Sequence, residues 1–557
     1  MKKNKLILCS SLNKSKELAN TNPDCDIFLL DAYESQFDKT ESKNIFINAV
    51  KFELSPENIA SEIASNWYRN DNSEDYYEGD TSMGLFLEWR LQCMLPVFFR
   101  YHLACEFWLG KYKEIVVSSS LPEIFKIIFA GYDRVKFSDF SDPLSNMTQV
   151  LLRRALPNER LSVASTILRK CQKIFGISRK NKILVFNDWT YKYQTHNEFI
   201  YVNSRNFLNG AYPERKKFVS GSFTEDFKEE LCIQSVKRIL TGFGVSNIDS
   251  LSKSIGKYIK YEYNYSREIA ERTYCDYLYL IEQYQPSSVI FPGDSQPKYS
   301  LLMQILNKKK IPHIVVMDGF LVKFEKYNFY KSRDGKDYLV KNHATTSEEM
   351  HHIFKQKFPK KCINFIRIQA PMFDYLSSIN HGHKRSYDAL ILFPVSNLRA
   401  VFSRPDKVLF FITQVVNMLK EINLNRIAIK LKQGIFKEQN KKFVETKFSG
   451  LVDFEEGPMH LALNKTERVI GQMASTIGEA AYSSVPYYVF EPVEFGLTDS
   501  ELNDSIINPE LIARTTKQLR SNILNKTFVN RSIKDLSHNV QLKDIDFKSL
   551  LTINQKN

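Results

Sequence analysis

The feature that most constrains the fold of this 557-residue chain is a regular alternation of short apolar runs with longer amphipathic stretches. Apolar runs such as "KLILCS" (5–10) and "SSVIFPGD" (287–294) predict strands. Amphipathic stretches such as "QPKYSLLMQILNKKK" (296–310) and "PDKVLFFITQVVNMLKEI" (405–422) predict helices. Strands buried on both faces carry continuous apolar runs, and parallel strands need a crossover connection, usually a helix. The alternation therefore predicts an α/β fold with parallel sheets.

A polar segment without periodicity, 376–387, is the best candidate for a linker. A chain of this length is also too long for a single hydrophobic core. We therefore predict two Rossmann-like halves that face a central cleft, an N-terminal half over residues 1–375 and a C-terminal half over residues 388–557. Residues 1–145 form either the first part of the N-terminal half or a separate subdomain.

The formal net charge of +14 favours an anionic partner. The basic residues are scattered, and no zinc-finger, recognition-helix or RNA-binding pattern accompanies them, so we expect no nucleic-acid partner. The sequence contains no apolar window of about 18 residues and no secretory signal pattern. We expect a cytoplasmic protein whose contact with the inner membrane is at most peripheral.

The sequence offers no metal-binding pattern. Its eight cysteines form no CxxC pair, and the histidine pairs "HH" (351–352) and "HGH" (381–383) lack the ligand spacing of a zinc site. We therefore expect no metal and no cofactor. The sequence also lacks a Walker A loop, a glycine-rich dinucleotide fingerprint, a nucleophile elbow and an HExxH motif. These absences argue against P-loop ATPases, simple dehydrogenases, α/β-hydrolases and zincins.

The segment "GQMASTIGEAAYSSVPYYVFEP" (471–492) carries the strongest indication of a binding site. A predicted strand ends near Gln472, and a predicted helix starts at Ser475 and Thr476. Their hydroxyls would join the unpaired N–H groups of the first helical turn around a phosphate. Glu479, one turn deeper, would accept hydrogen bonds from a ribose or sugar. The alternative is that Thr476 is an N-cap residue with Glu479 as its capping-box partner, and the segment alone does not decide between the two.

Two further strand ends in the C-terminal half carry groups suited to phosphate. The strand "RIAIKLKQG" places Lys430 and Lys432 on one face. The loop "SNLRA" after another strand offers Ser396, Asn397 and Arg399. The alternative for the lysines is an exposed edge strand that they protect from pairing with another chain. Three loops of one half that each offer phosphate donors favour a shared nucleotide site.

The C-terminal half, roughly 388–495, resembles the donor-binding half of GT-B glycosyltransferases. In that family a Ser/Thr-rich turn and a Glu-bearing helix hold the nucleotide sugar, and "ASTIGEAAYSSVPYYVFEP" is similar to this pattern. The order of "PGD", a helix, "IPHIVVMDG" and "IRIQAPMFD" is similar to the N-terminal half of bacterial surface-polysaccharide transferases and of related sugar-nucleotide epimerases.

Within that group, transferases that use CMP-activated acidic sugars of the sialic acid and Kdo type combine three motifs: an acidic residue before glycine, a His-Pro pair and a Ser/Thr pair. Asp318–Gly319 resembles the first motif and Ser475–Thr476 the third. The sequence "KLKQG" stands where His-Pro would be expected.

The catalytic candidates are acids at the ends of predicted strands in the N-terminal half. Asp318 follows "HIVVM" and precedes a glycine, so it would act as the general base that takes the proton of the acceptor hydroxyl. Asp294, after "VIFPG", is the second candidate, as a base or, in a retaining enzyme, as a nucleophile. The alternative for both is an aspartate that caps the next helix or turn.

The resemblance implies a metal-independent GT-B glycosyltransferase of surface-polysaccharide synthesis, such as that of capsule or lipopolysaccharide. It would move a sugar from a nucleotide-sugar donor, with CMP-linked acidic sugars among the candidates, to a surface glycan or lipid-linked acceptor. The donor would bind to Lys430, Lys432, Gln472, Ser475, Thr476 and Glu479. The acceptor would approach from the N-terminal half. Two alternatives stay open: a sugar-nucleotide epimerase or hydrolase on the same scaffold, and a non-enzymatic nucleotide- or glycan-binding protein.

Overall fold

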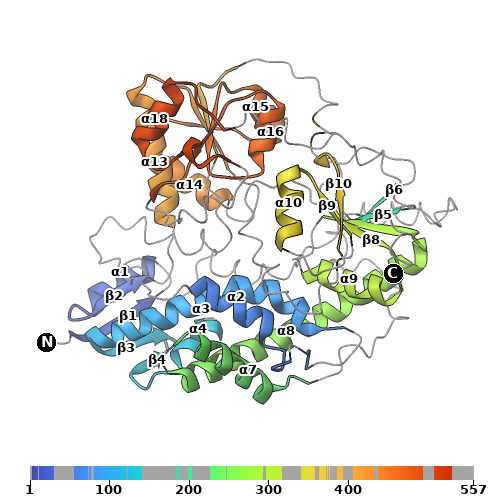
Figure 1. The fold of residues 1–557 in the computed structure, drawn as a ribbon. Coiled ribbons are helices and arrows are strands. Elements are labelled where there is room, and N and C mark those ends of the chain that lie inside the picture. Colours follow the sequence, from blue (N-terminus) through green and yellow to red (C-terminus); the bar gives the residue numbers. More distant parts are fainter. Residues whose placement is uncertain are drawn as a thin grey trace, which may run out of the picture.

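In the residues that it describes, the computed structural model has three sheets with helices around them (Figure 1). Every strand pair within these sheets is parallel. The structure describes residues 3–9, 12–29, 56–72, 74–76, 81–121, 123–140, 183–186, 199–202, 226–245, 247–292, 297–316, 340, 342–357, 363–371, 373, 376, 385–392, 405–431, 437–493 and 507–529. The predicted α/β fold with parallel sheets is confirmed.

The first sheet lies near the N-terminus and has the strand order β2-β1-β3-β4. Its strands are β1 (Lys3–Cys9), β2 (Asp26–Leu29), β3 (Tyr112–Ser118) and β4 (Val135–Ser138). The helices of this part are α1 (Leu12–Thr21), α2 (Pro56–Asn66), α3 (Met83–Lys111) and α4 (Glu123–Phe129). The inner strands β1 and β3 have the longest buried runs of this sheet, Leu6–Cys9 and Ile115–Ser118, as the continuous apolar run in β1 predicts.

The second sheet has the order β10-β9-β8-β7-β5-β6. Its strands are β5 (Ile183–Phe186), β6 (Phe199–Val202), β7 (Ser288–Phe291), β8 (His313–Val315), β9 (Asn342–Thr345) and β10 (Asn364–Arg367). The helices of this part are α7 (Glu229–Gly242), α8 (Ile248–Tyr284), α9 (Pro297–Lys308) and α10 (Glu348–Lys357). Numbered from its own first strand, this sheet begins 2-1-3-4-5, which is the flavodoxin-like doubly wound order.

The third sheet has the order β13-β12-β11-β14-β15-β16. Its strands are β11 (Ala389–Leu392), β12 (Ile427–Lys430), β13 (Asp453–Phe454), β14 (Val469–Gly471), β15 (Tyr487–Phe490) and β16 (Ile512–Ala513). Its helices are α13 (Pro405–Glu421), α14 (Lys437–Phe448), α15 (Met459–Asn464), α16 (Thr476–Tyr482), the 3₁₀ turn η9 (Pro509–Leu511) and α18 (Thr516–Leu524). Numbered within the sheet, the order is 3-2-1-4-5-6, the Rossmann order.

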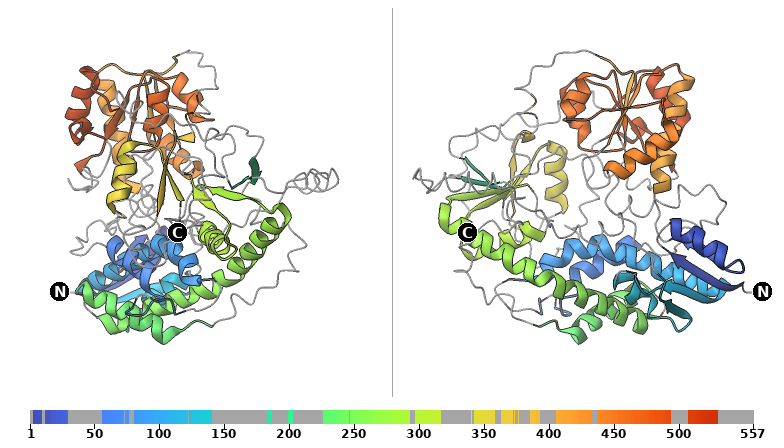
Figure 2. Two further views of the ribbon diagram at one scale, coloured as in Figure 1. Left: turned by 45° about the vertical axis from the view of Figure 1, so that its right-hand side comes forward. Right: turned by 180° about the vertical axis from the view of Figure 1, so that it is seen from behind.

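The first two sheets share one hydrophobic core. A single buried cluster contains Leu8 of β1, Phe98 of α3, Tyr258 of α8 and Val289 of β7. The long helix α8 connects these parts, and the two views of Figure 2 show it running beneath both. Among the helices of the described residues, including α3 and α8, none combines the length and the apolar character needed to cross a bilayer.

The third sheet has apolar layers on both of its faces. Ala370, Phe373 and Leu376, at or just before the start of the predicted linker, belong to one of these layers. The ring of Phe373 stacks on that of Tyr482 in α16, with 5.2 Å between the centroids. The grouping of residues 1–145 and the boundary between the predicted halves stay predictions.

Two polar contacts, one buried and one partly buried, fix α3 against its neighbours. Arg90 donates through Nε and Nη2 to the two carboxylate oxygens of Glu262 in α8, and the Nη2 contact measures 3.0 Å. The hydroxyl of Tyr258 donates to the same carboxylate at 2.7 Å. Near the other end of α3, Nδ1 of His102 lies 2.6 Å from the hydroxyl of Tyr132. Burial lowers the pKa of His102, so the imidazole is neutral at pH 7 and shares a hydrogen bond with the tyrosine hydroxyl, which also donates to the backbone carbonyl of His102 at 3.2 Å.

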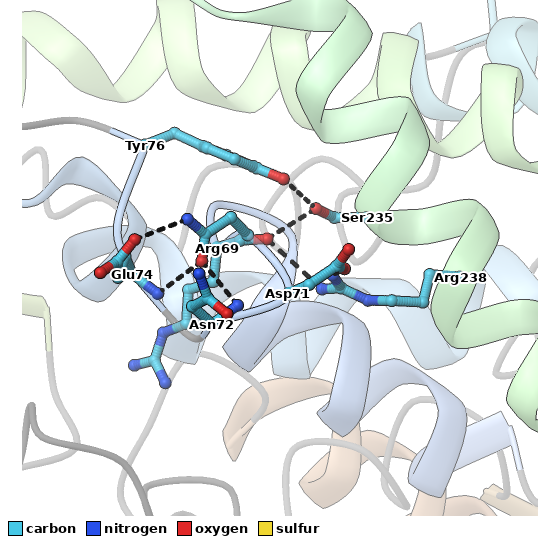
Figure 3. Close-up of polar contacts among 8 residues, drawn as sticks. Arg69, Asp71, Asn72, Glu74, Tyr76, Ser235 and Arg238 are labelled. Atoms are coloured by element: carbon cyan, nitrogen blue, oxygen red, sulfur yellow. Dashed lines mark hydrogen bonds and ion pairs between the residues drawn. The ribbon is translucent and has the colours of Figure 1, made fainter.

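The turn between α2 and α3 is tied to α7 by polar contacts that Figure 3 draws. The hydroxyl of Ser235 donates to the carbonyl of Arg69 at 2.8 Å and lies 2.9 Å from the hydroxyl of Tyr76. Arg238 forms an ion pair with Asp71 on the same turn. These contacts join segments more than 150 residues apart, because Ser235 and Tyr76 are separated by 159 positions.

Candidate functional site

The third sheet has a topological switch point between β11 and β14. These strands are neighbours in the sheet but are separated in the chain by β12 and β13. In doubly wound sheets the connections on the two sides of such a point leave toward opposite faces, and ligands bind outside the carboxyl ends of the strands there. The loop that follows β14, Gln472–Ser475, therefore lies where a ligand of this sheet is expected.

Five of the predicted site residues are described, and all of them lie at or after the carboxyl ends of inner strands. Lys430 ends β12, while Gln472, Ser475, Thr476 and Glu479 lie in the loop after β14 or at the start of α16. Parallel strands deliver their carboxyl ends to one edge of the sheet, so the topology places these residues at a common edge. Asp294, Asp318, Ser396, Asn397, Arg399 and Lys432 lie outside the described residues.

Lys430 is on an inner strand, because β12 pairs with β11 on one side and β13 on the other. The alternative of an exposed edge strand protected by lysine is therefore wrong for Lys430. Its side chain is only 8% exposed, and its ammonium group donates to the carbonyl of Gly457. A cation held in this position contributes positive potential to the carboxyl edge of the sheet.

The start of α16 differs from the predicted capping box. Ser475 occupies the N-cap position and makes no side-chain capping hydrogen bond, and Thr476 is the first helical residue. The first turn closes instead through short backbone bonds, from the N–H of Ile477 to the carbonyl of Ala474 and from Gly478 to Ser475, both at 3.0 Å. The alternative in which Thr476 is the N-cap residue is therefore wrong.

The loop after β14 is held by the neighbouring strand β15. Glu491, directly after β15, accepts hydrogen bonds from the amide of Gln472 and from the backbone N–H of Met473, each at 2.9 Å. The hydroxyl of Tyr487 donates to the carbonyl of Gln472 at 2.7 Å. Burial and, second, the Glu491 carboxylate raise the pKa of Tyr487 above its usual range, so this hydroxyl keeps its proton.

Glycine is required at the end of β14. A Cβ atom at Gly471 would lie 2.4 Å from the hydroxyl oxygen of Tyr487 and 3.2 Å from Cβ of Leu392. Only a residue without a side chain lets β14 approach both neighbours this closely. Sequence reasoning missed Tyr487 and Glu491, although the acid directly after the apolar run "YYVF" was a visible signal.

Within the part of the chain that the structure describes, no group of three or more His, Cys, Asp or Glu side chains is placed to hold a metal ion. The polar groups at the carboxyl edge are instead hydroxyls, an amide, carboxylates and one ammonium group. Such a set can bind the hydroxyl and phosphate groups of a ligand through hydrogen bonds.

No protein-family model matches the chain, and no curated protein sequence is significantly similar to it. Among solved structures, Methanocaldococcus jannaschii UDP-GlcNAc 2-epimerase in complex with UDP-GlcNAc and UDP aligns over 68% of this chain and 100% of its own, at 11% identity and a TM-score of 0.39. S. aureus MnaA, in a structure with UDP, aligns over 68% of this chain and 96% of its own, at 11% identity and a TM-score of 0.39.

The wall teichoic acid polymerase TagF aligns over 51% of this chain and 84% of its own, at 13% identity and a TM-score of 0.32. Scores below 0.5 are too low to establish a shared fold. The description of this chain as a doubly wound α/β protein therefore rests on its own strand orders.

Proposed function

We propose that the third sheet binds the nucleotide part of a nucleotide-sugar and that the protein is a glycosyltransferase. The observation that carries this proposal is the Rossmann strand order, whose switch point faces the polar loop Gln472–Ser475. The hydroxyls of Ser475 and Thr476 would donate to phosphate oxygens, and Lys430 would lower the cost of bringing the phosphates to this edge.

The transfer step is assigned to acids of the N-terminal part. Asp318 would take the proton of the acceptor hydroxyl while that oxygen forms the new glycosidic bond and the nucleoside phosphate leaves with the bonding electron pair. Asp294 is the second candidate for this base. The acceptor would be a surface glycan or a lipid-linked glycan, and CMP-linked acidic sugars stay among the candidate donors.

The first test is a thermal-shift screen of the protein against UDP-, GDP-, CMP- and CDP-linked sugars. Binding to the native state raises the melting temperature, by an amount equivalent to about 2.7 kcal/mol at a ligand concentration 100 times the Kd. One class of nucleotide should raise the temperature more than the others. A protein that responds to none of the four classes would refute the proposal.

The second test is a double variant, Ser475→Ala with Thr476→Ala, studied by calorimetry with the nucleotide found in the screen. Each hydrogen bond to a charged group contributes about 1.5–3 kcal/mol, so losing one should raise the Kd at least about tenfold. The matched control is Thr446→Ala with Ser521→Ala, which removes exposed hydroxyls from α14 and α18. Unchanged affinity in the first variant would exclude these hydroxyls from the site.

Incubation of the donor with and without an acceptor then separates the enzyme classes. A transferase releases nucleotide and extends the acceptor only when both are present. Conversion of the donor alone would indicate the epimerase or hydrolase alternative. Tight binding without conversion in either mixture would indicate a non-enzymatic binding protein.

A further inference from the structure

We infer that Glu491 is a positioning residue of the nucleotide site. Its buried carboxylate holds the loop Gln472–Ser475 in the conformation that faces the ligand. This inference rests on the proposed function and deepens it, because it names a residue on which nucleotide affinity depends although that residue does not touch the nucleotide.

The carboxylate of Glu491 binds the loop through both of its oxygens. Its side chain is buried, since the residue is only 3% exposed. One oxygen accepts the backbone N–H of Met473 and the other accepts the amide of Gln472, both at 2.9 Å. The backbone of Glu491 is fixed in turn, because its N–H donates to the carbonyl of Ala513 at 2.9 Å and continues the pairing of β15 with β16.

The same strand supplies a third attachment. Tyr487 and Glu491 are four residues apart, so in extended backbone their side chains lie on the same face. The Tyr487 hydroxyl donates to the carbonyl of Gln472 at 2.7 Å. The carbonyl and amide of Gln472 and the N–H of Met473 are thus all bound by β15 and the residue after it. The close approach of Tyr487 to Gly471 brings the end of β14 into the same assembly.

This arrangement also changes the role of Gln472. Its amide donates to Glu491, so the side chains of Gln472 and Glu491 together form a clamp on the loop, and Gln472 belongs to this clamp as well as standing at the predicted site. Ser475 has no capping bond of its own, and the position of its hydroxyl therefore depends on the loop before it. A buried carboxylate is costly to desolvate, and both of its oxygens receive donors here, which offsets that cost.

The decisive experiment exchanges the two side chains of the clamp. In Glu491→Gln, the new amide can still accept the N–H of Met473, but the negative charge is lost, and its NH₂ group can bond to Gln472 only if the Gln472 amide turns over. We expect the Kd of the nucleotide to rise about tenfold, the effect of one lost charge-assisted hydrogen bond. We also expect faster hydrogen exchange in peptides covering 471–476. Adding Gln472→Glu should restore both, because the amide introduced at position 491 would then donate to the carboxylate introduced at position 472.

The matched control is Asp388→Asn. Asp388 is likewise a carboxylate that binds a neighbouring segment: it accepts the backbone N–H groups of Asn425 and Arg426, each at 3.0 Å, and the guanidinium of Arg426. It lies before β11, at the opposite edge of the sheet. Its variant should lower stability and leave the nucleotide Kd unchanged. If Glu491→Gln does not fold, Tyr487→Phe removes only the bond to the Gln472 carbonyl and should raise the Kd by a smaller factor.

Three results would overturn the inference. The first is a Glu491→Gln variant with wild-type Kd, and the second is one with wild-type exchange at 471–476. The third is a reciprocal double variant that binds no better than the single one. If the unaltered protein binds no nucleotide, the proposed function fails and the binding role of Glu491 fails with it. Faster exchange in Glu491→Gln would then identify the clamp as a feature of the fold alone.

Discussion

The buried ion pair between α3 and α8 gives a quantitative prediction for the stability of the N-terminal part. Arg90 and Glu262 are 3% and 1% exposed, so neither charge has access to water. Burial lowers the pKa of the Arg90 guanidinium, but the Glu262 carboxylate more than offsets this and the pKa is raised, so the guanidinium stays charged. Each of the two charged side chains is therefore stabilised in its buried position by the other.

Glu262→Leu removes the acceptor of three donors: two guanidinium nitrogens and the Tyr258 hydroxyl. An uncompensated buried charge costs about 3–5 kcal/mol. The Tyr258 hydroxyl, left without its acceptor, would alone cost about 1–3 kcal/mol, and the two effects overlap because they arise at one carboxylate. We therefore expect the free energy of opening of this region to fall by about 3–5 kcal/mol.

Replacing both members of the pair tests the reasoning. Arg90→Met with Glu262→Leu removes both charges and fills the space with apolar atoms, so stability should return to within about 1–2 kcal/mol of the unaltered protein. Native-state hydrogen exchange of peptides from α3 and α8 is the suitable assay, because it reports the opening of this region separately from the third sheet. A single Glu262 variant that costs under about 1 kcal/mol, or a double variant as unstable as the single one, would refute the argument.

Three further predictions concern the same part of the protein. Gly84→Ala would place Cβ 2.1 Å from Cγ of the buried Tyr68 ring and should cost at least about 1–3 kcal/mol in urea unfolding, whereas Gly110→Ala, with nothing within 4 Å, should not destabilise α3. Burial lowers the pKa of His102 below its unfolded value of about 6.5, so its contribution to stability is present above that pH and is lost as the pH falls through the folded pKa. The melting temperature should therefore drop as the pH falls below about 6.5, and less so in His102→Gln. Ser235→Ala, which removes the hydroxyl shared by the turn before α3 and α7, should lower stability by about 1 kcal/mol, and no change in urea unfolding would show that the remaining contacts, such as the ion pair of Arg238 with Asp71, are sufficient to hold the turn.

The local sequence pattern was sufficient to locate individual strands and helices. The apolar run at 5–10 corresponds to β1 at Lys3–Cys9, and the amphipathic stretch at 405–422 corresponds to α13 at Pro405–Glu421. Both patterns are strong because burial on two faces, or on one helical stripe, dictates residue type along the whole element. The parallel α/β class followed from the alternation alone.

That pattern could not predict which strands are neighbours in a sheet. Nothing in the local sequence says that β14 lies beside β11 and β15, so the contact of Gly471 with Tyr487 and the binding of Gln472 by Glu491 could not be predicted. The first sheet is a similar case: the sequence left two alternatives for residues 1–145, because an apolar run does not show which sheet it joins. These features depend on pairing between segments distant in the chain.

A capping pattern gave opposite outcomes at two helices of the third sheet. At α18 the box forms: the side chain of Thr515 accepts the N–H of Gln518, whose own side chain accepts the N–H of Thr515. At α16 the spacing of Thr476 and Glu479 also fits a capping box, yet the helix starts one residue earlier than that box requires.

The loop before α16 accounts for the difference between the two helix starts. Before α16, Glu491 binds the N–H of Met473 and thereby fixes where the chain turns, two residues ahead of Ser475. The helix start is then set by the sheet, and the side chains at the first turn are not needed to order it. A capping bond would have engaged a hydroxyl that a ligand could otherwise use. The Glu491 carboxylate therefore has two consequences: the loop is ordered by its contacts with β15, and polar groups stay open at the carboxyl edge. For this reason, loss of that carboxylate should affect nucleotide affinity more than removal of any cap.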